Sequence, residues 1–133
     1  MDANRQRTAR PHTGPVVRYP LRIIAHLLIG LPSKPDGSVD YEAANPQSLE
    51  ALREELGTLI GVANNGVAAV GHLLALAASE ISGGEISGDS IEGLGWALTL
   101  LGDAAAWATE IKLRCDQANA DFSSPDSPLR RAS

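Results

Sequence analysis

The chain has 133 residues, with 11 Lys and Arg against 16 Asp and Glu and a formal net charge of −5. Apolar residues make up 44%, which excludes wholesale disorder, and this length gives one domain with room for one modest core. Aromatic residues make up only 4%, which argues against a β-sandwich or barrel, and the single Cys115 excludes a disulfide framework. The composition therefore predicts an all-α, soluble, cytoplasmic protein.

The first 15 residues are basic, polar and interrupted by proline, and they predict a flexible arm. Three of its arginines are candidates for contact with nucleic acid: Arg5, Arg7 and Arg10. Arginines without interleaved aromatic residues are a generic signal, so we do not expect nucleic acid to be the main partner. No apolar run precedes residue 16, which argues against a signal peptide.

A single helical domain is expected over residues 16–120, and its first helix covers residues 20–30. Pro20 suits the first helical turn and Gly30 suits a C-terminal cap. A buried strand remains the alternative, because periodicity cannot distinguish so short an apolar run. Residues 32–44 then form a loop, with a turn at residues 35–37 (Pro-Asp-Gly).

A long helix is expected over residues 46–80. Asn45 is an N-cap type, and Pro46 follows at the first helical position. Apolar or small residues then recur at alternating spacings of three and four over four heptads. Residues 63–66 (Ala-Asn-Asn-Gly) have poor helix propensity and are the weak point at which the helix can kink.

A second long helix is expected over residues 89–119, running antiparallel to the first. Asp89 is its expected cap, and Glu92, three residues on, is a partner of the capping-box type. Residues 121–133 are polar and rich in serine and proline, and they predict a disordered tail.

Both long helices contain several glycines, which each cost about 0.5–1 kcal/mol relative to alanine. We expect a close approach of the two backbones to compensate for this cost. The glycines are Gly57, Gly61, Gly66, Gly71, Gly93, Gly95 and Gly102.

The last helix carries more apolar surface than one partner helix can cover. Four large residues fall within an arc of about 60° beside its heptad seam: Trp96, Leu100, Trp107 and Ile111. Two acids, Asp103 and Glu110, flank this arc. Either the helix at 20–30 folds over these residues, or they form an interface, since tryptophan is enriched among interface anchors. Two hairpins associating as a homodimer complete a four-helix bundle.

No arrangement of residues points to catalysis, a metal or a cofactor. The three histidines lie in separate segments without metal-ligand spacing. Lys112 and Arg114 are expected to lower the pKa of Cys115 somewhat, but no histidine is placed as its base, so a buried structural cysteine is the default. The apolar stretches at 62–78 and 94–109 contain polar residues and fall short of the ~20 that a membrane span needs, so we expect no membrane span.

Charge is segregated along the chain. Residues 1–22 hold five Arg and one Asp, a net of +4, while residues 36–121 hold three basic residues and fourteen acids, a net of −11. An acidic helical body suits a basic protein partner.

Two stretches, residues 63–74 (ANNGVAAVGHLL) and 89–96 (DSIEGLGW), resemble small all-helical proteins carried by bacterial phages and integrative mobile elements. The resemblance covers about residues 58–118 and implies no catalytic residues. It implies a bacterial or phage origin and favours an accessory or counter-defence role.

The sequence therefore predicts a non-enzymatic protein-interaction module that self-associates through its last helix. Two alternatives remain open. One is a phage or mobile-element inhibitor of host defence machinery, whose acidic helical face binds a basic host protein. The other is a DNA-associated regulator that uses the basic arm.

Overall fold

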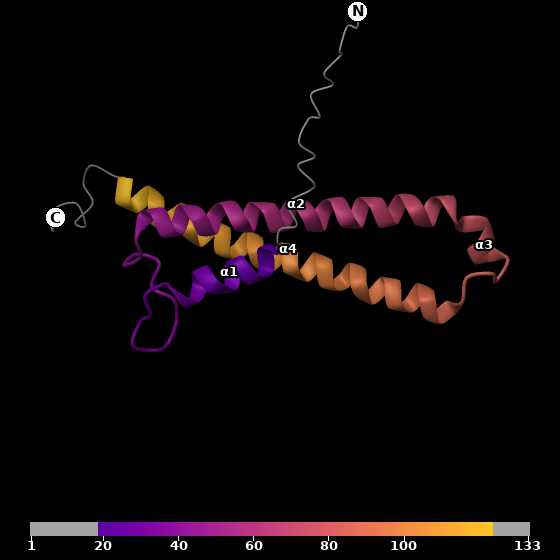
Figure 1. Cartoon of the computed structure of the whole chain (residues 1–133), viewed down its shortest axis with the longest axis horizontal. Coiled ribbons are helices and arrows are strands. Elements are labelled where there is room, and N and C mark those ends of the chain that lie inside the picture. The colour runs from indigo at the N-terminus through magenta and orange to yellow at the C-terminus, as the bar shows by residue number, and fades with distance from the viewer. Residues whose placement is uncertain (1–18, 124–133) are drawn as a thin grey trace, which may run out of the picture.

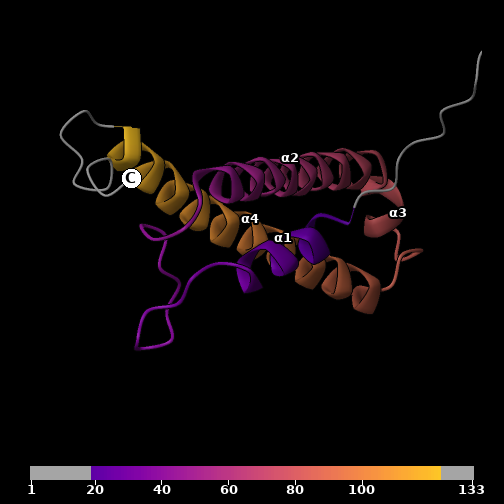
Figure 2. The same cartoon turned by 60° about the vertical axis from the view of Figure 1, so that its left-hand side comes forward.

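A computed structural model describes residues 19–123 of the chain. This part contains four helices: α1 (Pro20–Ile29), α2 (Pro46–Leu76), α3 (Ala78–Ser82) and α4 (Gly88–Ser123). α2 and α4 form a long antiparallel hairpin closed by α3, and α1 packs beside its open end (Figures 1 and 2). Within the described range, extended pairing is limited to one isolated bridge between Ser33 and Val39. The all-α class predicted from the sequence is confirmed.

The short apolar run after Pro20 is a helix, and the strand alternative is wrong. Proline opens α1, and the Gly30 N–H closes it by donating to the carbonyls of His26 and Leu27. Ile24 on this helix is fully buried. α1 is therefore the third helix of the core, packed beside the two helices of the hairpin.

The loop after α1 turns where the Pro-Asp-Gly sequence predicts. The Gly37 N–H donates to the Lys34 carbonyl at 2.9 Å, and Gly37 has φ +85°, which favours glycine. Asp36 Oδ1 accepts hydrogen bonds from the backbone N–H and the hydroxyl of Ser38, at 2.9 and 2.7 Å. This turn sends the chain back toward α4.

α2 begins as predicted but ends earlier. Asn45 caps it, its side chain accepting from the Gln47 N–H at 2.8 Å. The helix passes unbroken through residues 63–66, because Ala63 is buried and Gly66 packs against Leu101 of α4. The break comes at Ala77, so the helix expected over 46–80 is α2 followed by the short α3.

α4 is longer than expected at both ends. Its first turn is capped by Ser87, whose hydroxyl oxygen accepts from the Ser90 N–H at 3.3 Å, so the expected Asp89 cap is wrong. The Glu92 carboxylate instead accepts a long 3.5 Å hydrogen bond from Trp96 Nε1. The helix runs to Ser123, so residues 121–123 of the expected tail are helical. The expected arm at residues 1–15 and the rest of the tail lie outside the described residues.

The buried core lies entirely at the open end of the hairpin. Ala63 is the last buried residue of α2 and Ala108 the first of α4, and no described residue between them is buried. The fully buried side chains of largest volume are Ile24, Leu49, Leu52, Leu56 and Cys115. We call the end that contains this core and α1 the proximal end, and the end closed by α3 the distal end.

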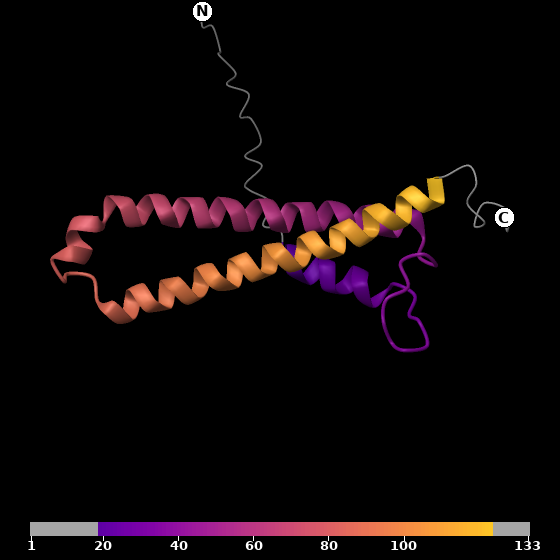
Figure 3. The same cartoon turned by 180° about the vertical axis from the view of Figure 1, so that it is seen from behind.

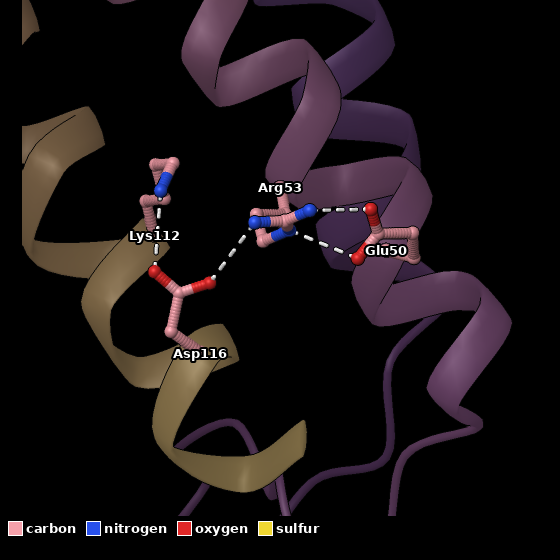
Figure 4. Close-up of polar contacts among 4 residues, drawn as sticks. All are labelled: Glu50, Arg53, Lys112 and Asp116. Atoms are coloured by element: carbon pink, nitrogen blue, oxygen red, sulfur yellow. Dashed lines mark hydrogen bonds and ion pairs between the residues drawn. The ribbon is translucent and has the colours of Figure 1, made fainter. Parts of the chain in front are cut away.

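Ion pairs join α2 to α4 at the proximal end. Arg53 forms a bidentate pair with Glu50 through Nε and Nη2, at 2.9 and 2.6 Å, and its Nη1 lies 3.6 Å from Asp116 of α4 (Figure 4). Asp116 in turn accepts from Lys112 at 3.2 Å. Hydrogen bonds from Arg53 lower the pKa of Glu50. Because these side chains are partly exposed, solvent screens the pairs and they add little, so the apolar core supplies most of the stability.

The helical glycines do not mark a close approach of the two backbones. A Cβ added at Gly66 lies 3.5 Å from Leu101 Cδ1, but at the other six glycines expected to do this it meets nothing within 4 Å. The expectation of a tight glycine seam within the hairpin is therefore wrong. Most of these glycines face open space.

Truncating a core residue should cost far more than truncating an exposed leucine of similar size. Leu56→Ala should lower the free energy of unfolding by about 2–5 kcal/mol, because Leu56 is fully buried and its truncation leaves a cavity. Leu113→Ala, at a side chain 56% exposed, should change it by less than about 0.5 kcal/mol. Urea denaturation followed by circular dichroism measures both, and equal losses would contradict the location of the core.

Candidate functional site

The distal end of the hairpin presents an exposed apolar surface made by both helices. We define this distal face as Val62, Ala69, Leu73 and Leu76 of α2 with Gly93, Trp96 and Leu100 of α4. All seven are exposed. On each helix, these residues fall within an arc of about 60° at 100° per residue.

The two arcs lie on the same side of the hairpin. On α2 the arc is offset by about 100° from the buried, α4-facing residues. On α4 it is offset by about 140°, in the same rotational sense, from Leu94, Leu98 and Leu101, which are half-buried toward α2. Antiparallel helices have opposite rotational senses when viewed from one end, so offsets in the same sense turn both arcs toward one side of the hairpin. Leu100 and Gly93 turn to the same side as the α2 arc, whereas Trp96 lies at the outer edge of α4, and the two helices diverge toward α3 (Figure 1).

α1 and its loop cover the proximal end of this same side. Trp107 of α4 continues the Trp96 and Leu100 arc, and it lines a groove together with Val39 and Tyr41 from the segment after α1. Seen from behind, α4 passes in front of α1, and the distal end stands clear of it (Figure 3). α1 thus covers only the proximal part of this side and leaves the distal part exposed.

The candidate residues chosen from the sequence fall into two groups, those that α1 and its loop cover and those that remain exposed. Trp96 is 69% and Leu100 70% exposed, so the idea that α1 folds over them is wrong. Ile111 is 9% exposed and packs in the core, and Trp107, at 42%, stands at the boundary. The flanking Asp103 and Glu110 are exposed, and Glu110 accepts from Arg114 at 2.7 Å. Arg5, Arg7 and Arg10 lie outside the described residues.

The α2 half of the distal face was missed from the sequence, although a signal for it exists. Residues 56–79 contain no Asp, Glu, Lys or Arg. α2 is long and apolar enough to cross a membrane by length and composition, and only 11% of its most apolar 18-residue window is buried. A charge-free helix that its own fold leaves exposed indicates a surface covered by something else.

The proximal groove of about 780 Å³ was also not predicted, because it depends on where the loop after α1 folds. Tyr41 and Trp107 contribute aromatic surface, and Lys34, Glu42 and Arg114 contribute charges of both signs. Burial raises the pKa of Tyr41, with smaller contributions from Cys115 and Glu110. The Ser38 hydroxyl in its lining donates to Asp36 at 2.7 Å as part of the turn after α1.

Cys115 is a core residue and not a reactive thiol. Burial, with a smaller contribution from Asp116, raises its pKa to about 11 and outweighs the nearby cations. Lys112 does lower the pKa, but Arg53 rather than Arg114 is the other cation that acts on it, and burial outweighs both, so the expected net lowering is wrong. The default of a buried structural cysteine is confirmed. Among residues 19–123, no group of three His, Cys, Asp or Glu side chains is placed to hold a metal.

The buried thiol predicts a loss of stability in alkaline solution. The unfolded thiol ionises near its ordinary pKa of 9.0 and the native one near 11, so the free energy of unfolding should fall by up to roughly 3 kcal/mol as the pH rises through this window. Denaturation of the native chain and of Cys115→Ala at pH 8 to 11 measures the difference. The variant should start less stable but lack this part of the fall, and parallel curves would contradict the assignment.

Comparison with known proteins yields no match. No protein-family model matches the chain, and no curated protein or solved structure is significantly similar to it. The residues of the distal face and their arrangement are therefore the basis for a functional proposal.

Proposed function

We propose that the protein is a non-enzymatic protein-interaction module whose contact surface is the distal face. The observation that supports this is the exposure of Trp96, Leu100 and Leu73 at the distal end of a hairpin whose buried core lies at the proximal end. Large contiguous apolar patches on soluble proteins mark interaction surfaces, and tryptophan is enriched among their energetic anchors. Such a face suits a helical partner, which packs along both α2 and α4.

A protein suits this face better than a lipid bilayer does. The turn that closes the hairpin carries Glu80, Glu85 and Asp89. To insert α2 across a bilayer as part of this hairpin, these carboxylates have to pass through the hydrocarbon, at about 2.5–3.5 kcal/mol each even on the most permissive scale. At a protein interface, the same acids remain in solvent at the rim.

Placing a charge on the distal face should abolish association without unfolding the monomer. In Trp96→Asp the carboxylate replaces a side chain that makes no core contact, so helicity should stay within error, and the assembly should be weakened by 100-fold or more, as expected for a central anchor. Light-scattering mass and circular dichroism measure the two effects.

Leu113→Asp is the matched control. Leu113 is on the same helix and 56% exposed, but it lies about 100° around the helix from Trp96, outside the arc of the distal face. It should leave association unchanged. Equal loss in both variants, or loss of helicity in Trp96→Asp alone, would count against the distal face as the contact surface.

A further inference from the structure

The position of α1 restricts how a second hairpin can reach the distal face. α1 starts near the middle of the hairpin and runs toward the proximal end, leaving the distal end bare (Figures 1 and 3). Two copies stacked in parallel bring α1 against α1, and a helix about 10 Å in diameter on each copy holds the distal faces apart. Two antiparallel copies avoid this contact, because each distal end fits into the space beyond the other copy's α1.

The residues of the distal face are spaced symmetrically above and below one level along the hairpin axis, so a second copy turned by 180° at that level can pair with them. Ala69 stands midway between Val62 and Leu76, and Leu100 stands midway between Gly93 and Trp107. Ala69 and Leu100 lie at nearly the same height, since a Cβ at Gly66 lies 3.5 Å from Leu101.

A two-fold axis at this height pairs the largest side chain near the distal face with a glycine. It places α2 on α2 and α4 on α4, each pair antiparallel, and brings Trp107 of one copy over Gly93 of the other. The Cβ position of Gly93 is open, so a large side chain can lie on it. Val62 meets Leu76, which is an apolar contact between two side chains of similar size.

Charge complementarity supports the same arrangement. The antiparallel pairing brings the acidic tip, with Glu80, Glu85 and Asp89, to the start of the other copy's α1. The first turn of α1 has no acid, carries Arg22, and presents the positive end of the helix dipole. Residues 56–79 of α2 carry no charged side chain. Where α2 of one copy packs on α2 of the other, no like charges are therefore brought together.

The available area is also of the right order for a dimer. Val62, Leu73, Leu76, Trp96 and Leu100 each expose roughly 100 Å² of apolar surface. With the alanine and glycine surface between them, each copy approaches the ~800 Å² per partner of a stable interface.

We propose that the partner at the distal face is a second copy of this chain, packed antiparallel with its acidic tip against the start of α1. This inference rests on the proposed function. α1 then has two roles: it completes the proximal core, and it fixes the register of the dimer.

Disulfide trapping tests the arrangement in the full-length chain. Three single substitutions at exposed sites are used: Ala69→Cys at the centre, Ser82→Cys at the tip and Leu21→Cys at the start of α1. Cys115 can stay, because its buried thiol, with a pKa of about 11, does not compete. Ala69→Cys should form a disulfide-linked dimer under mild oxidation, and Ser82→Cys should cross-link with Leu21→Cys in a mixture but not with itself. Ala68→Cys, exposed on another side of α2, is the control that should stay monomeric on a denaturing gel.

The outcomes separate this inference from the proposed function. A mass of twice 13.9 kDa with the cross-links above supports both. The same mass with Ser82→Cys cross-linked to itself overturns the antiparallel arrangement and leaves the proposed function intact. A monomer at all concentrations overturns the second copy as partner, and co-sedimentation of that monomer with phosphatidylcholine–phosphatidylglycerol vesicles overturns the proposed function as well.

Charge reversal at the start of α1 gives an independent readout. Arg22→Glu should weaken the dimer by about three- to tenfold at low salt, and the difference should shrink in 1 M NaCl, where charges are screened within about 3 Å. Lys34→Glu reverses an exposed charge on the loop after α1 and should have no such effect. Equal affinities for Arg22→Glu and Lys34→Glu at low salt would overturn the contact between tip and α1.

Discussion

Two helices packed side by side can bury only the stripe that each turns to the other, and a third element is needed to enclose a core. In this chain the third element is α1, which has ten residues, whereas α2 has 31 and α4 has 36. The core therefore extends only as far as α1 reaches. Ile24 of α1 is fully buried, as are Leu56 of α2 and Cys115 of α4, and beyond Ala63 the hairpin has no buried residue until Ala108. The exposed apolar face, the open glycines and the proposed partner surface all follow from this difference in length.

The sequence was sufficient for the elements whose limits depend on local chemistry. Pro20, Pro46 and the Asn45 cap act within one turn of the backbone, and the helices start there. Residues 63–66 were expected to permit a kink on propensity alone, but contact with α4 outweighs a propensity difference of about 1 kcal/mol. The cap at Ser87 was missed because Asp89 and Glu92 formed the more familiar pattern, although a serine one position before the first helical residue serves equally well.

The candidate site could be predicted only in part, because one helix does not define a surface. Periodicity placed Trp96 and Leu100 on a common stripe, but it could not show that α1 stops short of them. It grouped Ile111 with them, since one helical stripe can be core at one end and surface at the other. The α2 half of the distal face depends on the relative rotation of two helices, and only the charge-free stretch at 56–79 indicated it.

The uneven burial along the hairpin gives the molecule one stiff end and one compliant end. Backbone hydrogen bonds in the arms beyond Ala63 are protected by few tertiary contacts, and glycines such as Gly71 and Gly95 add conformational freedom there. The distal arms can thus fray and re-form while the proximal core stays folded. A partner that docks on them orders the helices as it binds, so part of the binding free energy is spent on local folding. A lower affinity than the contact area suggests, with a gain in exchange protection on binding that is confined to the arms, is the behaviour that such a hairpin favours.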